Sequence, residues 1–474
     1  MTLLAGASIL LFIVWLGLFR PTIFVCLAFL LFTFAWRTIS SLYIDLSGPV
    51  FSSQFAMFLG PGVMTVFQSI TYFLTLLPFL WVFNSRTLDE WARSAPTPGV
   101  PATQSQLTLS DVTFYASILF LILLFGALIQ GGIIPLFAKI ERWTFNEQAN
   151  FLHRLVIERG DMLCFWWGTM FVAERLRRQR YDYRFVGLLA VLIFYMFLVG
   201  GRFSPFYRSC AFFVIPFSAV LLAQARDLGS ASIFSLMPRI ADRRIVLAGA
   251  GGIALTVAMI AFALYWNLTR VRGFEGQAAL GAFIERVLVQ PSEIGWASYQ
   301  RVLVNGDWDA RHAFDFLFDR PIVAGRNTTP QFLMSETIGE PRTTEHITGG
   351  FQFAGGFPEI FFELFGPELG WIFLLGAGWL TALLSAVMIR SVVAERYLTA
   401  ALSFYVLYGI YVMYIGGMLN FVATPTYWVK IAALFAAIIV EERAQRSGRP
   451  ILPWVLADRP LWFRWFRRSA AWRP

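Results

Sequence analysis

A short aromatic stretch late in the chain carries the carboxylates with the best potential for chemistry. Residues 349–371, GGFQFAGGFPEIFFELFGPELGW, hold Glu359, Glu363 and Glu368 among Phe and Gly. On a helix, Glu359 and Glu363 share one face because they are four residues apart. A carboxylate that aromatic side chains shield from water suits a general base. Glu363 is therefore the candidate catalytic base, and Glu359 is a candidate substrate-binding residue. The structural alternative is that Glu359 caps the helix and Glu363 pairs with a nearby arginine.

A histidine lies just upstream of this stretch. The chain has only three histidines, His153, His312 and His346. His346 falls in GEPRTTEHITGG, between Arg342 and the glutamates, so it is a second candidate for acid–base catalysis. The competing interpretation is a structural histidine, which is the commoner role of an isolated one.

Arginine supplies nearly all of the positive charge, since lysine occurs only at Lys139 and Lys430. An arginine fork binds phosphate oxygens bidentately. Four arginines fall in segments expected at the outer membrane surface and are candidate pyrophosphate ligands: Arg202, Arg208, Arg326 and Arg342. For each of them, pairing with a lipid headgroup or a carboxylate is the alternative.

The elements that must position these residues are membrane helices. The chain is 57% hydrophobic and only 14% charged, against about 25% charged in a typical soluble protein. Apolar runs recur at lengths that suit helices crossing about 30 Å of hydrocarbon. Their approximate limits are 2–19, 21–37, 62–84, 113–135, 160–174, 185–200, 207–224, 245–266, 369–389, 398–418 and 427–441. The sequence therefore predicts an all-α polytopic membrane protein with about eleven transmembrane helices.

The arginine-rich segments predict how these helices are oriented. Residues 174–184 hold five arginines, residues 442–474 hold eight, and residues 225–244 and 390–396 are also basic. The alternation of spans places all four segments on one side, which the positive-inside rule makes the cytoplasm. Residues 268–367 hold eight Arg against twelve Asp and Glu, and they then lie outside, as does the N-terminus.

Four regions follow from this topology. They are an N-terminal transmembrane bundle of about eight spans (1–267), a large periplasmic loop (268–367), C-terminal transmembrane helices (368–441) and a basic aromatic cytoplasmic tail (442–474). The first apolar run lacks a basic start and a cleavage site, so we expect it to remain as an anchor.

Some segments outside the spans also have predictable structure. Apolar periodicity predicts amphipathic helices over residues 276–290 and 309–321 of the loop. Trp and Phe beside Arg in residues 462–468 fit an interfacial helix on the inner leaflet, with a disordered basic tail as the alternative. Residues 85–112 form a polar linker with no recognisable chemistry.

Several function classes lack their signatures. No GxxxxGK[ST], HExxH or GxSxG motif occurs, and Cys26, Cys164 and Cys210 form no metal or disulfide pattern. We therefore expect neither a metal nor a cofactor. The net charge of +9 lies in short loops and the tail, which indicates topology and contact with membrane lipids instead of nucleic acid.

The chain resembles the Wzy-type O-antigen and exopolysaccharide polymerases, which join oligosaccharide repeat units in bacteria. Many of these end a large periplasmic loop in a Gly/Pro-rich turn, followed by Glu, an aromatic residue and Gly just before a span. Pro358, Glu363, Phe365 and Gly366 stand in that order here. QGGIIPLF (130–137) also resembles the GG-I-P-L-F turn of such proteins. The layout of spans and loop is similar too, with an outward Arg202 between two middle spans. The chain departs from the pattern at Phe362, where Gly is usual, and at Leu364, where Asn or Asp is frequent.

The resemblance implies a GT-C-like glycosyltransferase of the bacterial inner membrane that is inverting and metal-independent. Its donor would be a growing glycan on undecaprenyl pyrophosphate, and its acceptor the distal hydroxyl of one lipid-linked repeat unit. The four arginines would stabilise the diphosphate, and Glu363 or His346 would act as the base. A Wzz-like chain-length regulator would be a partner.

Three other functions stay open. An O-antigen ligase shares the architecture and more often uses an outward histidine. A polyprenyl-phosphate-sugar transferase would need an acidic residue and often a metal near the first outer loop, where Asp45 is the candidate. A lipid flippase or permease is disfavoured because internal repeats are missing and few ionisable residues lie in the spans.

Overall fold

A computed structural model describes most of the chain. The described residues are 1–84, 107–138, 145–146, 148–201, 203–227, 258, 261–262, 264–271, 273–310, 329–348, 355–447 and 450–457. Helices account for nearly all of this structure, as the hydrophobic composition predicts.

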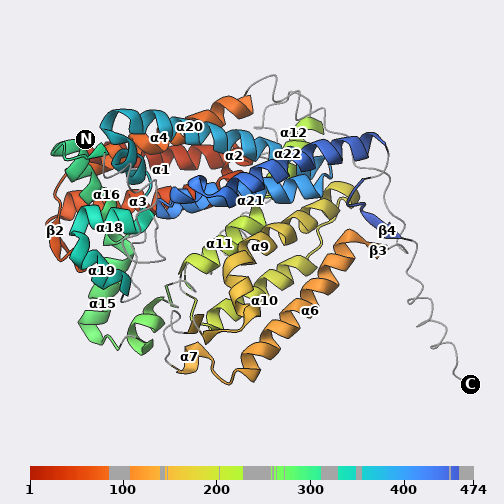
Figure 1. Cartoon of the computed structure of the whole chain (residues 1–474), viewed down its shortest axis with the longest axis horizontal. Coiled ribbons are helices and arrows are strands. Elements are labelled where there is room, and N and C mark those ends of the chain that lie inside the picture. The colour runs from red at the N-terminus through yellow and green to blue at the C-terminus, as the bar shows by residue number, and fades with distance from the viewer. Residues whose placement is uncertain are drawn as a thin grey trace, which may run out of the picture.

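Long helices run side by side and form the body of the molecule (Figure 1). They are α1 (Thr2–Phe19), α3 (Ala28–Ser47), α4 (Met64–Asn84), α6 (Leu109–Gln130), α9 (Phe151–Arg178), α10 (Arg184–Leu198), α20 (Glu359–Val393), α21 (Tyr397–Gly416) and α22 (Pro425–Arg446). Shorter helices complete the body: α2 (Pro21–Cys26), α7 (Pro135–Ala138), α11 (Phe203–Val214), α12 (Phe217–Asp227) and the 3-10 turn η5 (Asn420–Ala423).

The segment between α12 and α20 contains short helices, several of them with π-type hydrogen bonding. They are η2 (Asn267–Val271), α15 (Gly276–Ile284), η3 (Glu285–Val289), α16 (Glu293–Ser298), η4 (Tyr299–Val304), α18 (Thr329–Ile338) and α19 (Glu340–Thr348). The helix predicted over 276–290 is confirmed by α15 and η3. Of the helix predicted over 309–321, residues 311–321 lie outside the described part, as do residues 85–106 of the linker and 458–474 of the tail.

Six helical segments in the described part are long and apolar enough to cross a membrane. They are Thr2–Phe19, Met64–Phe83, Leu109–Ala138, Pro205–Ala223, Glu359–Val393 and Tyr397–Gly416. This is the make-up expected of an all-α, membrane-embedded protein. The count of eleven spans and the GT-C-like arrangement stay predictions, and most of the predicted span 245–266 is outside the described residues.

The two ends of the helical body differ. We call the end that carries the hairpin β1 (Val50–Ser52) and β2 (Met57–Leu59) with residues 285–304 and 329–348 the loop end. We call the end that carries β3 (Leu107–Thr108) and β4 (Val455–Ala457) the tail end. Figure 1 shows the N-terminus at the loop end, on the left, and the β3–β4 pair at the opposite end.

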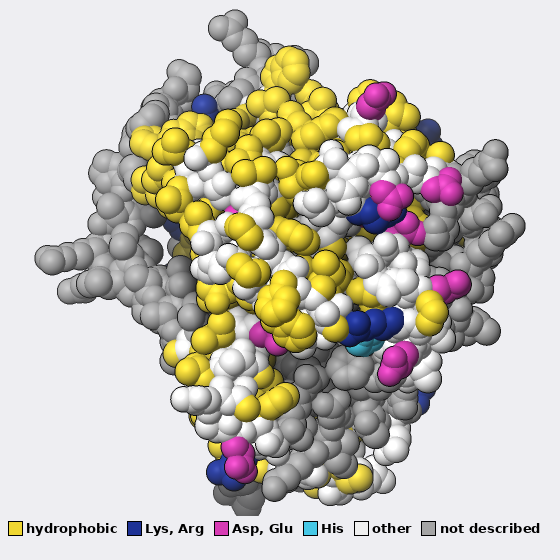
Figure 2. Space-filling model, turned by 90° about the vertical axis from the view of Figure 1, so that its left-hand side faces the viewer, with side chains coloured by type: hydrophobic (Ala, Val, Ile, Leu, Met, Phe, Trp, Pro, Cys, Tyr) yellow, Lys and Arg dark blue, Asp and Glu magenta, His cyan; other side chains and the backbone are white. Residues whose placement is uncertain are grey.

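Residues 285–289 at the loop end are hydrogen-bonded to side chains of α3. The Trp36 indole donates a hydrogen bond to the carbonyl of Val287 at 2.9 Å, and the Ser40 hydroxyl donates to that of Leu288 at 2.9 Å. Figure 2 looks straight at this end: hydrophobic side chains dominate its left and upper parts, and most charged side chains lie on the right. The contacts place residues 38–61 and 285–292 at one end of the body, in agreement with the predicted topology.

At the tail end, the chain beyond α22 folds back. Strand β4 pairs antiparallel with β3, and the Leu109 N–H donates to the carbonyl of Trp454 at 2.8 Å. The buried Trp454 indole lies under the guanidinium of Arg177, 5.1 Å from ring centroid to Cζ. Residues 107–108 and 450–457 therefore share one end, as the predicted topology requires.

Helix α20 contains the break that Gly366-Pro367 predicts. Gly366 has φ 81° and ψ 173°, which ends a short first helix before the long apolar one starts. The positive φ favours glycine. The absence of a Cβ at this position also lets the Trp308 ring approach closely. A Cβ built at Gly366 would lie 3.1 Å from three ring atoms of Trp308. The short first helix, which carries Glu359 and Glu363, is therefore separated by this break from the long helix that follows it.

Candidate functional site

Glu363 lies in a sealed site at the loop end. Its side chain is 0% exposed and forms an ion pair with Arg301 from η4. Arg301 also contacts Glu336 of α18, with Nη1 2.9 Å from Oε2, and it donates to the carbonyl of Asp307 at 3.0 Å. We call the group Glu363, Arg301 and Glu336 the carboxylate site. The Arg301 guanidinium of η4 therefore pairs with two carboxylates, one from α18 and one from α20.

Polar capacity in the carboxylate site is only partly used. The Glu363 Oε1 atom and the Arg301 Nε atom are both buried and have no hydrogen-bond partner. Trp308 covers the site from the side, and its indole N–H donates to the main-chain carbonyl of Glu363 at 2.9 Å. Leaving a buried polar atom unpaired is costly, so a water molecule or a ligand is the physical expectation at these atoms.

Glu359 is held in a second buried pair, one turn earlier on the same helix. Its Oε1 lies 2.5 Å from Nη2 of Arg37, and the two side chains are 1% and 3% exposed. Arg37 also donates from Nε to the carbonyl of Pro291 at 2.8 Å, and Ser292 donates back to the carbonyl of Arg37 at 2.8 Å. Arg37 therefore joins α3, the loop segment and the start of α20.

The space around the Arg37–Glu359 pair is tight and polar. A Cβ built at Gly295 would lie 2.3 Å from Oε1 of Glu359, so only glycine allows this approach. Arg37 Nη1, Glu359 Oε2, the Tyr72 hydroxyl and both amide atoms of Gln68 are buried without a hydrogen-bond partner. Polar bonding capacity between α3, α4 and α20 is therefore left unused.

A further carboxylate anchors the hairpin to the loop. Oε2 of Glu293 in α16 accepts a hydrogen bond from the Ser52 hydroxyl at 2.7 Å, and Oε1 has no partner. Burial raises the pKa of Glu293 to about 8, the hydrogen bond from Ser52 opposes that rise, and the charge of Glu285 adds to it. Glu293 is therefore largely protonated at neutral pH.

Arg208 occupies a different setting, within the helical body. Its Nε lies 3.5 Å from Oδ2 of Asp161, which also accepts a hydrogen bond from the Tyr408 hydroxyl at 2.9 Å. A pocket opens beside this pair, and we call it the arginine pocket. Its lining residues are His153, Val156, Ile157, Asp161, Tyr195, Met196, Val199, Gly201, Pro205 and Arg208. His153 is tied to Tyr195 at 2.8 Å from Nδ1 to the hydroxyl.

The structure brings some of the predicted site residues into buried pairs and leaves others elsewhere. Glu363 is paired with Arg301, which was the structural alternative to a free base. Glu359, whose alternative role was to cap the helix, makes no side-chain cap hydrogen bond and pairs with Arg37. Arg342 donates to the carbonyl of Phe55 at 3.3 Å, and His346 is half-buried on α19. Arg202 and Arg326 lie outside the residues that can be placed, as does His312.

Sequence reasoning missed the partners. Arg301, Arg37 and Asp161 were not among the predicted site residues, yet each pairs with one that was. Arg37 carried the clearest available signal, because it stands at the end of a predicted span. Among the described residues, no group of three or more His, Cys, Asp or Glu side chains is arranged to hold a metal ion.

Comparisons with known proteins place only part of this chain. Residues 324–428 match a family described as a family of unknown function, DUF6418. The matched region contains α18, α19, α20 and α21, hence Glu336, Glu359 and Glu363, but not their arginine partners. No curated protein and no solved structure matches the chain.

Proposed function

We propose that this protein is a membrane glycosyltransferase that polymerises lipid-pyrophosphate-linked oligosaccharide repeat units at the outer face of the bacterial inner membrane. The observation that carries the proposal is the carboxylate site. It offers a water-shielded carboxylate with one unpaired oxygen, beneath a helical segment that covers one end of a membrane-type helical body. The substrate class comes from the resemblance of the sequence to the Wzy-type polymerases.

The chemistry needs a base and a stabilised leaving group. Glu363 takes the proton of the acceptor hydroxyl, whose oxygen forms a bond to the anomeric carbon of the donor glycan. The bond from that carbon to the phosphate oxygen breaks with inversion, and undecaprenyl pyrophosphate leaves as the anion. Because the leaving group is already a diphosphate, fixed guanidinium groups can stabilise its charge.

In this proposal Arg208 binds the diphosphate end of the donor, which has to displace Asp161 and widen a cavity of only about 20 Å³. Arg208 follows Tyr207, whose hydroxyl lies 3.3 Å from Thr33 Oγ1 on α3. One helical turn along α3, about 6 Å further, Arg37 pairs with Glu359. The carboxylate site lies one turn beyond Glu359 on α20. A lipid-linked oligosaccharide is extended enough to reach across these few helical turns.

A flippase is the second candidate, and one observation favours it. The sequence argument against it relied on span interiors with few ionisable groups, yet the buried Asp161 pairs with the partly buried Arg208 within the helical body. Intramembrane ion pairs of this kind mark substrate or proton paths in transporters. The alternative ligase would use His346, which lies half-buried on α19.

The test uses purified full-length protein in proteoliposomes with a lipid-linked repeat unit. We expect Glu363→Gln to abolish long polymer, because the base is lost. The matched control is Glu368→Gln, which changes an exposed carboxylate five residues further on, beyond the break at Gly366, and keeps polymer length normal. Normal polymer from Glu363→Gln would overturn the catalytic role. Translocation of the lipid without a new glycosidic bond would support the flippase instead.

A further inference from the structure

Two positively charged side chains converge on one tyrosine in a candidate membrane span. Tyr405 lies on α21, near the middle of the segment Tyr397–Gly416. The Lys430 ammonium of α22 lies 4.1 Å from the centroid of its ring. The Arg159 Cζ atom of α9 lies 5.4 Å from the same centroid, and Arg159 Nη1 donates to the Tyr405 hydroxyl at 2.7 Å. Side chains from three helices therefore bring two positive charges to one ring.

These two charges are not neutralised by a carboxylate. In the part of the chain that the structure describes, both side chains contact Tyr405, and neither forms an ion pair. Glu158, the neighbour of Arg159 on α9, is exposed. Asp161, two residues further on, is already paired with Arg208. Like charges that share one ring repel each other, most strongly where little water screens them. An anion that contacts both cations would remove that repulsion.

A second, independent observation indicates that a lipid reaches this place. The exposed residues of α22 between Lys430 and the tail end, and those just before Lys430, are all apolar as far as Val440: Trp428, Val429, Ala432, Phe435, Ala436, Ile439 and Val440. Lipid chains are the expected neighbours of such a surface in a membrane-embedded protein. Lys430 is half-buried and Arg159 is exposed, so a lipid can contact both from outside the helical body.

We propose that Arg159 and Lys430 bind the phosphate group of a membrane lipid, and that Tyr405 holds the two cations together. Phosphate oxygens accept hydrogen bonds from a guanidinium fork and from an ammonium group. The hydrocarbon chain of the lipid lies along the apolar face of α22. Charged side chains at this depth commonly mark the path of a substrate, and Asp161 of the arginine pocket lies only two residues from Arg159 on α9. The inference is independent of the chemistry proposed for Glu363.

The experiment measures lipid binding to the purified full-length protein by native mass spectrometry. The probes are undecaprenyl phosphate and phosphatidylglycerol, each compared with its uncharged counterpart, undecaprenol and diacylglycerol. We expect a phosphate lipid to bind at least tenfold more tightly than its counterpart. A preference for undecaprenyl phosphate would identify an isoprenoid lipid as the occupant, and equal binding of the two phosphates would identify a phospholipid headgroup. Uncharged lipids that bind as tightly as the phosphates would overturn the proposal.

The variants remove the two charges without touching the carboxylate site. Arg159→Gln combined with Lys430→Gln should lose at least tenfold in affinity for the phosphate lipid. The matched control is Arg446→Gln, which removes a 77% exposed cation from the other end of α22 and should change the affinity less than twofold. Wild-type affinity in the double variant would overturn the site.

Two further variants keep the test decisive if the double variant fails to fold. The exchange of Arg159→Lys with Lys430→Arg keeps both charges and should bind the phosphate lipid, whereas Lys430→Gln alone should lose affinity severalfold. Wild-type affinity in Lys430→Gln would contradict the proposal. Glu363→Gln should bind the lipid as the wild-type protein does, so a loss of polymer in that variant tests glycosyl transfer and not this site.

Discussion

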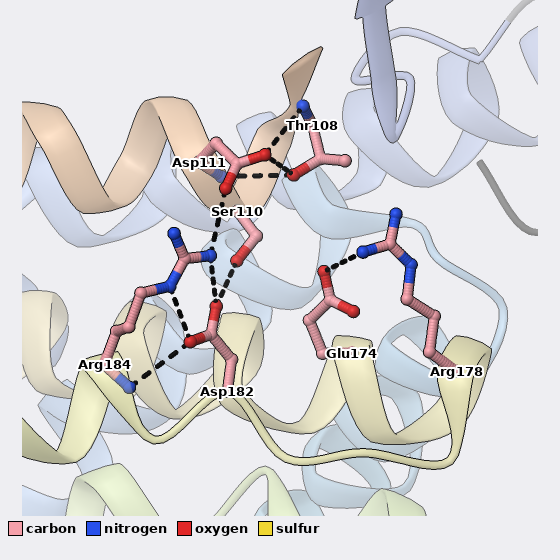
Figure 3. Close-up of polar contacts among 7 residues, drawn as sticks. All are labelled: Thr108, Ser110, Asp111, Glu174, Arg178, Asp182 and Arg184. Carbon is pink, nitrogen blue, oxygen red and sulfur yellow. Dashed lines mark hydrogen bonds and ion pairs between the residues drawn. The ribbon is translucent and has the colours of Figure 1, made fainter. Parts of the chain in front are cut away.

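The Arg184 cluster at the tail end and the ion pairs at the loop end use charge in different ways. At the tail end, Arg184 donates to Asp182 from Nε at 2.8 Å and from Nη2 at 2.7 Å, and it reaches Asp111 at 3.0 Å. Ser110 donates to Asp182 at 3.0 Å, and Thr108 and Asp111 form a capping box at the start of α6 (Figure 3). In this cluster each carboxylate fixes a turn or a helix end, and Arg184 remains 39% exposed. A second pair at the tail end, Arg177 with Glu395, is more buried and leaves Arg177 Nε and Glu395 Oε1 without a hydrogen-bond partner.

At the loop end, the ion pairs are buried and incompletely bonded. Arg37, Glu359, Arg301 and Glu363 each keep one buried polar atom without a partner. A buried ion pair with a purely structural role is often no better than well-packed apolar residues. The difference teaches that the charges of the Arg184 cluster close turns, whereas those of the loop-end pairs leave polar bonding capacity unused. Three predictions test this contrast.

The largest effect is expected at the Arg37–Glu359 pair. Glu359→Leu leaves the guanidinium of Arg37 buried and unpaired, which should lower the free energy of unfolding by about 3–5 kcal/mol. The double variant Arg37→Met with Glu359→Leu removes both charges and should recover most of that loss. Thermal unfolding in detergent measures both. If the single and double variants lose the same stability, the pair contributes by its packing and the contrast with the tail end fails.

An intermediate effect is expected from Glu293 as the pH changes. Its pKa of about 8 in the folded protein exceeds the ordinary value near 4.3, so the folded state holds a proton that the unfolded state has released. Stability from this group is therefore complete below about pH 4 and is lost as the pH rises towards 8, by at most about 1.4 kcal/mol per pH unit.

Glu293→Gln should remove this part of the pH dependence, because the amide stays neutral. Unfolding temperatures from pH 5 to pH 8 give the measurement, and Glu345→Gln, an exposed change on α19, is the control. If the unfolding temperatures of the wild-type protein and of Glu293→Gln change with pH in the same way over this range, Glu293 is not protonated in the folded protein.

The smallest effect is expected at the tail end. Arg184→Ala removes contacts with Asp182 and Asp111 that are partly open to solvent, so the loss should stay below about 1 kcal/mol. Because exposed pairs are screened, the loss should shrink further in 1 M salt. Unfolding temperatures at low and high salt measure this. A loss as large as that of Glu359→Leu would erase the distinction between the two ends.

The sequence predicted local features well and long-range partners poorly. The end of the short helix at Gly366 follows from the backbone chemistry of Gly and Pro, and the helix over 276–290 follows from apolar periodicity. The pair of Arg37 with Glu359 joins residues 322 positions apart, and no local pattern announces such a contact. Arg301 had the same difficulty, since it lies in a π-helical segment 62 residues before Glu363.

The site prediction was limited for a related reason. Residue type marked Glu363 and Arg208 as chemically capable, but burial and pairing depend on which helices pack together. Asp161 became the partner of Arg208 only because α9 lies against α11. The catalytic role of Glu363 and His346, and phosphate binding by the predicted arginines, remain predictions.

The pairing of β3 with β4 restricts the number of membrane crossings in the chain between these two strands. Two hydrogen-bonded strands must lie on one face of a bilayer, so the chain must traverse it an even number of times between Thr108 and Val455. Eight of the eleven apolar runs fall in that interval, and eight satisfies the rule. A reporter that fixes the sidedness of Val455 therefore also fixes that of Leu107, without any tag in the linker.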